Sequence, residues 1–189
     1  AKFGGIPVIN GLTDYCHPCQ VLADLMTIRE YKGELEGCKL VYIGDGNNMA
    51  NSLIVGGLLA GMDVAIATPD DYRPHPEVLE FTKKYGSKFT LTNNIYEAAE
   101  DADALFTDVW SSMGMEAEIE KRKIAFDGYQ INDKLMAKAK KDAMVQHCLP
   151  AHRGEEITDE VFEAHANEIF DEAENRLHAQ KAVMATLMK

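Results

Sequence analysis

Two residues near the amino end of the sequence could hydrogen-bond a small polar substrate. His17 and Gln20 stand in the sequence HPCQ, at the start of an expected helix. A proline fits the first turn of a helix, and both side chains can direct donors at one small acceptor. The more common role of an isolated histidine at a helix start is that of a cap or a packed surface residue.

A carboxylate, Asp108, lies at the end of an expected strand and precedes the sequence VWSSMG. Together with two hydroxyls and Gly114, which permits close backbone approach, it suits a cationic amine. The alternative is helix capping, in which Ser111 or Ser112 caps the next helix and Asp108 favours its positive end.

The densest cluster of reactive side chains is HCLPAHRGEE at 147–156. It places the thiol of Cys148 at a strand end beside two imidazoles and a guanidinium. A nearby cation lowers the pKa of a thiol, so we expect Cys148 to act as a proton acceptor or a polar anchor. The alternative is a buried small side chain without a chemical role.

A glycine-containing turn, GDGNN at 44–48, joins an expected strand to an expected helix. Helix amino ends attract phosphate, but a dinucleotide fingerprint needs GxGxxG, and the third glycine is absent here. NAD(P) binding is therefore a minor alternative. By themselves, Asn47 and Asn48 fit a turn and a helix cap.

Short apolar runs alternate with helical patterns along the chain, and this alternation predicts an α/β fold. Expected strands cover 39–44, 63–68, 88–91, 104–109 and 143–148; expected helices cover 18–31, 49–62, 77–85, 95–101 and 171–189, with further polar helices between 115 and 141. The pattern implies a doubly wound, mostly parallel sheet with helices on both faces. Ligands bind beyond the carboxyl ends of such strands, where the polar segments fall.

Composition narrows the class of protein. The chain has 189 residues, of which 46% are hydrophobic and 26% charged, as in a globular domain. A net charge of −12 disfavours nucleic acid and anionic membranes as partners. The absence of a long apolar stretch or a signal-peptide pattern predicts a soluble intracellular protein.

The cysteines and the first residue give two further expectations. Four cysteines are too few for a disulfide scaffold, and the single CxxC of Cys16 and Cys19 lacks a second half-site, so we expect free thiols and no metal. The chain begins at Ala1 rather than at a methionine, which indicates part of a longer protein.

Five motifs, taken in order and spacing, resemble the ornithine carbamoyltransferases across essentially the whole chain. They are HPCQ at 17–20, GDGNN at 44–48, DVWSSMG at 108–114, HCLPAHRGEE at 147–156 and FDEAENRLHAQKAVM at 170–184. Cys19 departs from the threonine that is frequent at that position of the family. Aspartate carbamoyltransferases differ at HCLP and lack the Ser-Met-Gly loop, and putrescine carbamoyltransferases are expected to differ in that loop; both remain alternatives.

The resemblance implies a Rossmann-like half of a carbamoyltransferase. The enzyme would transfer the carbamoyl group of carbamoyl phosphate to the δ-amine of L-ornithine, giving L-citrulline and phosphate, without a metal or organic cofactor. Arginine biosynthesis or the urea cycle is the implied setting, and HCLPAHRGEE is closer to the biosynthetic type. A cytoplasmic homotrimer is implied, with the mitochondrial matrix as the alternative location.

The resemblance also assigns residues to roles. The implied catalytic residues are His17, Asp108 and Cys148; the implied carbamoyl phosphate contacts are His17, Gln20, Cys148, Leu149 and Arg176; the implied ornithine contacts are Asn48, Asp108, Ser112 and Met113.

The resemblance covers the ornithine-binding domain, expected over residues 1–189. Within it, 1–33 and 171–189 are expected to be helical segments that contact a missing amino-terminal carbamoyl phosphate domain. The Ser-Thr-Arg-Thr phosphate loop of the family does not occur in the chain. We therefore expect weak ornithine binding and negligible citrulline formation by the chain alone. A non-catalytic amino-acid-binding module is the remaining alternative, although the joint presence of Cys148 and Asp108 argues against it.

Overall fold

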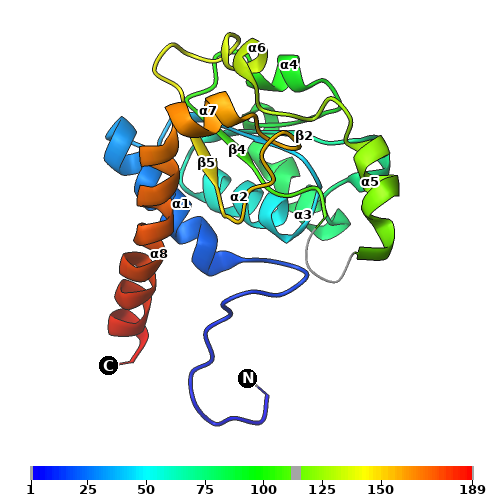
Figure 1. Ribbon diagram of the computed structural model, residues 1–189. Coiled ribbons are helices and arrows are strands. Elements are labelled where there is room, and N and C mark those ends of the chain that lie inside the picture. The colour runs from blue at the N-terminus through cyan, green and yellow to red at the C-terminus, as the bar shows by residue number, and fades with distance from the viewer. Residues whose placement is uncertain (1, 112–115, 189) are drawn as a thin grey trace.

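The sheet that the sequence predicts is present, and its strands are all parallel. The computed structural model describes residues 2–111 and 116–188, and within that part of the chain five strands pair in the order β3-β2-β1-β4-β5 (Figure 1). The strands are β1 (Lys39–Ile43), β2 (Asp63–Ala67), β3 (Phe89–Thr92), β4 (Ala104–Thr107) and β5 (Met144–His147). Every strand end lies within two residues of its predicted position.

Helices cover both faces of the sheet, because successive strand residues point to opposite sides. Leu40 and Tyr42 pack in a buried cluster with residues of α1, α2 and α3, whereas Val41 and Ile43 pack with residues of α4, α6, α7 and α8. The helices are α1 (Pro18–Lys32), α2 (Asn48–Leu59), α3 (Pro76–Thr82), α4 (Ile95–Ala99), α5 (Ile119–Ala125), α6 (Asp133–Met136), α7 (Asp159–Ala164) and α8 (Ala166–Leu187), with short 3₁₀ turns η1 (Asp70–Tyr72), η2 (Lys83–Lys88) and η3 (Glu116–Glu118). This arrangement confirms the predicted α/β fold.

The terminal helices differ from the expectation in their bounds. Within 1–33 only α1 is helical, and residues 2–17 contain no helix. The last helix begins at Ala166 rather than at residue 171, because Ile169 is fully buried in the core and extends the packed face beyond the predicted apolar seam. The short helix α7 is absent from the predicted elements.

Helices α1 and α8 are far apart in the sequence but lie side by side in the structure (Figure 1). Tyr31 Oη donates to Asp171 Oδ2 at 2.6 Å, and Asn175 Nδ2 donates to Thr27 Oγ1 at 3.0 Å. At the other end of α1, Gln20 Oε1 accepts from Arg176 Nη1 in the middle of α8. Among residues 2–111 and 116–188, no helix has both the length and the apolar character needed to cross a bilayer.

Candidate active site

The loops after β1, β4 and β5 meet at the carboxyl edge of the sheet. β2 lies on one side of β1 and β4 on the other, so the winding of the chain reverses between β1 and β4. Ligands of open α/β sheets bind at such a switch point. Three predicted segments converge there: 44–48 follows β1, Asp108 follows β4 and Cys148 follows β5.

Asp108 is the centre of the hydrogen bonds that join these loops. Cys148 Sγ donates to Asp108 Oδ1 at 3.2 Å, and Asn47 Nδ2 donates to Asp108 Oδ2 at 3.0 Å. The backbone N–H of Val109 also donates to Oδ1, at 2.8 Å. Since Asp108 is only 7% exposed, these three donors hold its carboxylate in one orientation.

The two asparagines after β1 cap a helix and also make hydrogen bonds to other segments. Asn47 Oδ1 accepts from the backbone N–H of Met49 at 2.9 Å and of Ala50 at 3.2 Å, which confirms the predicted cap of α2. The same side chain binds Asp108, so one amide begins the helix and orients the carboxylate. Asn48 Nδ2 donates to the carbonyl of Thr13 at 2.8 Å and anchors the segment before α1.

Close packing fixes the loop that carries Asn47. Gly46 N–H donates to the carbonyl of Tyr72 at 2.8 Å, and a Cβ at Gly46 would stand 2.3 Å from the carbonyl carbon of Arg73. The neighbouring Asp45 accepts from Arg122 Nη1 at 2.7 Å, and both side chains are buried. Glycine is therefore required at position 46 by the approach of another backbone segment.

His147 holds the turn that contains Cys148. Its Nδ1 accepts from the backbone N–H of Leu149 at 2.9 Å, which leaves Nε2 to donate to Glu156 Oε1 at 3.0 Å. Both side chains are fully buried. His147 and Glu156 are absent from the predicted site residues, although both lie in the HCLPAHRGEE segment.

The expected activation of Cys148 by a cation is wrong. The His147 ring faces a carboxylate of its own, and Arg153 pairs with two exposed carboxylates. Loss of hydration, followed by the negative charges of Asp108 and Glu172, raises the pKa of the Cys148 thiol well above its usual range. Cys148 is therefore a protonated donor to Asp108 and not a proton acceptor.

A second group forms where α1 begins. His17 and Gln20 are buried there, and Gln20 Oε1 accepts from Arg176 Nη1 of α8. His17 does not cap α1, and its Nδ1 has no partner among the described residues. Burial, followed by the charge of Arg176, lowers the pKa of His17, so the ring is neutral at pH 7. The structure thus brings together three of the predicted carbamoyl phosphate contacts.

Two buried acids connect this second group to β5. Gln20 Nε2 donates to Asp24 Oδ1 at 2.8 Å and to Glu172 Oε1 at 3.0 Å, while His147 N–H donates to Glu172 Oε2 at 2.9 Å. Neither acid is among the predicted site residues. A signal was present for Asp24, because it interrupts the apolar face of the helix predicted over 18–31.

Two predicted ligands, Ser112 and Met113, lie outside the described residues, so their ornithine contacts stay predictions. The thiols of all four cysteines are free. His152, Glu155 and Glu156 each offer one potential metal-ligand atom within 4.8 Å of the others. Glu155 pairs with Lys123 and Glu156 with His147, so both carboxylates already have protein partners and we assign no ion to them.

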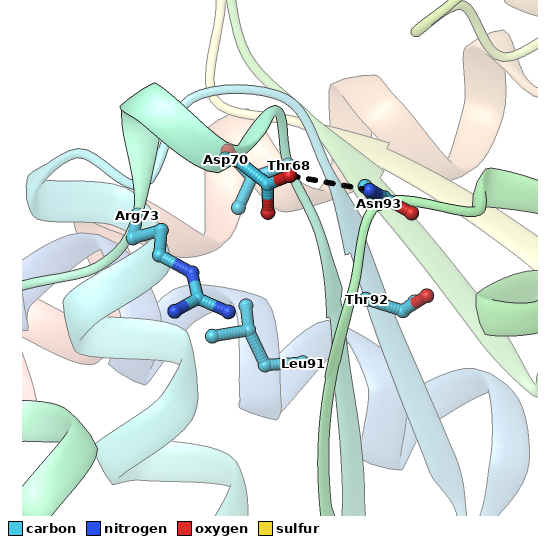
Figure 2. Close-up of a pocket in the computed structure, with 6 residues that line it drawn as sticks. All are labelled: Thr68, Asp70, Arg73, Leu91, Thr92 and Asn93. Carbon is cyan, nitrogen blue, oxygen red and sulfur yellow. Dashed lines mark hydrogen bonds between the residues drawn. The ribbon is translucent and has the colours of Figure 1, made fainter.

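A polar pocket of about 250 Å³ lies beside this site, at the carboxyl ends of β2 and β3 (Figure 2). Figure 2 shows Asp70 turned toward Asn93, whose Nδ2 lies 3.4 Å from Asp70 Oδ2. The pocket is lined by Thr68, Asp70, Arg73, Leu91, Thr92 and Asn93. None of the predicted site residues lines this pocket, so we do not include it in the candidate active site.

The family models that match the chain describe the two halves of one enzyme. The model "Aspartate/ornithine carbamoyltransferase, Asp/Orn binding domain" matches residues 36–187, and the model for the carbamoyl-P binding domain matches residues 1–30. The ornithine carbamoyltransferases of Thermococcus kodakarensis and Geobacter metallireducens are 51% and 53% identical over the whole chain, which spans 61% and 63% of their lengths.

The solved structures that resemble this chain are also ornithine carbamoyltransferases. The ornithine carbamoyltransferase of Pyrococcus furiosus superposes with a TM-score of 0.91 at 50% identity, over 99% of this chain and 61% of that one. The anabolic enzyme of Campylobacter jejuni superposes with a TM-score of 0.93 at 42% identity, over 98% of this chain and 63% of that one.

Proposed function

Because this chain belongs to the aspartate/ornithine carbamoyltransferase family, we propose that it carries the ornithine side of a carbamoyl-transfer site. The reaction transfers the carbamoyl group of carbamoyl phosphate to the δ-amine of L-ornithine and releases L-citrulline and phosphate. The observation that carries this proposal is the Asp108 carboxylate, which Cys148 and Asn47 hold at the switch point of the sheet.

The negative charge of the Asp108 carboxylate favours ornithine over aspartate as the substrate. A fixed carboxylate attracts the terminal ammonium group of ornithine and repels the second carboxylate of aspartate. The relatives from Thermococcus kodakarensis and Geobacter metallireducens are also named ornithine carbamoyltransferases. Putrescine carries the same terminal amine without an α-amino acid group. A comparison of the affinities of the chain for ornithine and putrescine therefore distinguishes these two substrates.

The δ-amine must lose a proton before it attacks, and Asp108 is placed to receive it. Ornithine arrives as an ammonium ion, which the Asp108 carboxylate binds, and only the neutral amine is nucleophilic. Oδ2 of Asp108 accepts only from Asn47 and can therefore accept a further hydrogen bond, whereas Oδ1 already accepts two. Cys148 keeps its own proton and holds the carboxylate in place.

The amine then forms a C–N bond to the carbamoyl carbon, and the C–O bond to phosphate breaks. Negative charge builds on the carbamoyl oxygen in between, where a preorganised donor has its largest effect. We assign that donor to the neutral ring of His17, which is buried where α1 begins and lies within range of the Arg176 charge. Arg176 supplies positive charge for the departing phosphate.

The carbamoyl phosphate side of the site is completed by sequence beyond this chain. The chain spans 61–63% of the relatives it matches, and it lacks the Ser-Thr-Arg-Thr phosphate loop. We propose that segments 1–33 and 171–189, which include α1 and α8, contact the remainder of the carbamoyl phosphate domain, to whose family model residues 1–30 already match. Positioning of two reactants is a large part of catalysis, so the chain alone binds ornithine weakly and forms negligible citrulline.

We extend the proposal to the cellular setting. A role in arginine biosynthesis is supported by the word "anabolic" in the name of the Pyrococcus furiosus relative. A homotrimer and a cytoplasmic location complete the proposal. Light scattering of the enzyme, assembled with a carbamoyl phosphate domain, tests the trimer directly.

Calorimetry of the 189-residue chain with ornithine, putrescine and aspartate tests the substrate. We expect ornithine to bind best, and Asp108→Asn to weaken it by about 10-fold or more, the effect of losing a charged hydrogen bond. Asp70→Asn is the matched control, since Asp70 lies in the neighbouring pocket. Preferred binding of aspartate or putrescine would contradict the substrate assignment.

Catalysis needs a second protein, a fusion in which the part of the Pyrococcus furiosus relative that this chain does not span precedes it. We expect citrulline from the fusion and none from the chain alone. A fusion that folds, binds ornithine and still forms no citrulline would favour the non-catalytic binding module.

A further inference from the structure

Glu172 contacts two parts of the candidate site that are far apart in sequence. It lies on α8 and is fully buried. Its Oε1 accepts from Gln20 Nε2 at the start of α1, and its Oε2 accepts from the backbone N–H of His147 at the end of β5. The Glu172 carboxyl group therefore links the cluster of His17, Gln20 and Arg176 to the turn that carries Cys148 through two hydrogen bonds.

The amide of Gln20 has all its hydrogen-bonding groups assigned. One Nε2 hydrogen goes to Glu172 and the other to Asp24, which is also fully buried, one turn further along α1. Its Oε1 accepts from Arg176. An amide has nearly the same shape when its oxygen and nitrogen are exchanged, so only its partners fix its orientation. Here two acids lie on the nitrogen side and a guanidinium lies on the oxygen side.

We propose that Glu172, together with Asp24, is a positioning residue for carbamoyl transfer: it locks the Gln20 amide with its oxygen toward Arg176, the side chain that we assign to the departing phosphate. This inference rests on the proposed function. Without Glu172 the Gln20 amide loses an acceptor and can rotate. In the rotated form the NH₂ group would face the Arg176 cation, whose Nη1 then loses its acceptor, while Nε and Nη2 keep the side-chain oxygen of Gln180.

The protonation of the two acids is consistent with this role. Burial raises the pKa of Asp24 to about 7 and raises that of Glu172 well above its usual range. Both acids accept from the same Gln20 nitrogen, so their charges oppose each other at close range, and we expect the pair to hold a proton rather than carry two charges. Two acceptor oxygens thus remain for Gln20 at a lower desolvation cost than two full charges would require.

The first test is spectroscopic and uses the 189-residue chain. We expect Glu172→Gln to shift or broaden the side-chain amide resonances of Gln20 in ¹H–¹⁵N spectra, because an amide at position 172 cannot accept from both Gln20 and His147. Glu174→Gln is the matched control: Glu174 is exposed on the same helix and contacts His178. Unchanged Gln20 resonances in Glu172→Gln would overturn the proposal.

The second test is kinetic and uses the fusion. We expect Glu172→Gln to lower kcat/KM for carbamoyl phosphate by about 10- to 100-fold, and Glu174→Gln to leave it unchanged. Glu172 acts through Gln20, so its substitution should have little further effect on kcat/KM for carbamoyl phosphate in a Gln20→Ala background. Independent, multiplying effects would show a general structural role and overturn the proposal.

Glu172→Asp provides the variant for both tests if Glu172→Gln does not fold. It keeps the carboxylate but shortens the side chain by one methylene, and we expect an intermediate change. A wild-type fusion that forms no citrulline would count against the proposed function, while the Gln20 resonances would still decide the role of Glu172.

Discussion

Cys148 and Asp108 are a hydrogen-bonded pair, with Sγ 3.2 Å from Oδ1, although they lie 40 positions apart in sequence. They follow β5 and β4, which are adjacent in the sheet. The pairing of these strands therefore places a thiol donor beside the carboxylate that we assign to the amine. The raised pKa of Cys148 keeps the proton on sulfur and maintains the donor.

Removal of the thiol should weaken ornithine binding. We expect Cys148→Ala to raise the Kd of the chain for ornithine about 5-fold, as for the loss of one hydrogen bond of about 1 kcal/mol. Cys148→Ser keeps a donor and should bind nearly as well as the wild type. Calorimetry measures both, with Cys38→Ser as a remote control. Equal losses for Ala and Ser would contradict a donor role.

The buried ion pair behind the site should be required for stability. Asp45 and Arg122 side chains are 10% and 7% exposed, and burial raises the pKa of Asp45 even though Arg122 opposes the shift. Arg122→Met leaves Asp45 buried without its partner, so we expect a loss of about 3–5 kcal/mol in the free energy of unfolding. Urea denaturation measures it.

A matched surface substitution separates this effect from a general loss of charge. Arg153→Met removes an exposed ion-paired arginine and should cost about 1 kcal/mol or less. The double variant Asp45→Asn with Arg122→Met should be more stable than Arg122→Met alone, because no uncompensated charge remains buried. A double variant that is less stable would refute this explanation.

A side chain at position 46 should disrupt the loop that orients Asn47. The added Cβ of Gly46→Ala would meet the backbone of 72–74, with the carbonyl carbon of Arg73 at 2.3 Å. We expect a loss of about 1–3 kcal/mol in unfolding free energy, together with weaker ornithine binding. Gly11→Ala has open space around its Cβ and is the control. Equal stability of the two variants would disprove the close approach.

Asp24 should make stability depend on pH in a defined direction. Its folded pKa of about 7 exceeds the ordinary 3.8, so between these values the folded chain binds more protons than the unfolded chain. The contribution of Asp24 to stability therefore falls as pH rises from about 4 to about 7. The charged groups of Glu172 and Arg176 also face the Asp24 carboxyl group. The pH dependence of the unfolding free energy must therefore be compared between the wild type and a variant that differs at position 24 alone.

Asp24→Asn removes this titration. Relative to the wild type, we expect the unfolding free energy of the variant to increase between pH 5 and pH 8, measured by urea denaturation at each pH. The exposed Asp71→Asn should show no such trend. A constant difference between wild type and Asp24→Asn across this range would exclude a proton held at Asp24.

The sequence by itself determined the layers of the fold and the edge of the sheet at which the candidate site residues gather. Short β-branched runs such as 39–44, alternating with helices, leave a parallel sheet as the way to bury both apolar faces. Because the strands are parallel, polar residues at their carboxyl ends, such as Asp108 and Cys148, must lie at the same edge of the sheet. This placement can be predicted without knowing any distance. Start and stop signals near Pro18 and Gly33 also gave α1 its bounds.

Only the tertiary structure decided how these side chains are used. The state of Cys148 depends on which charges lie near it in space, and the cations adjacent in sequence turned out to face other carboxylates. Glu172 meets Gln20 across 152 positions, a contact that no local pattern encodes. Burial and proximity set pKa values and hydrogen-bond partners, and they arise only when β4 pairs with β5 and α8 packs against α1.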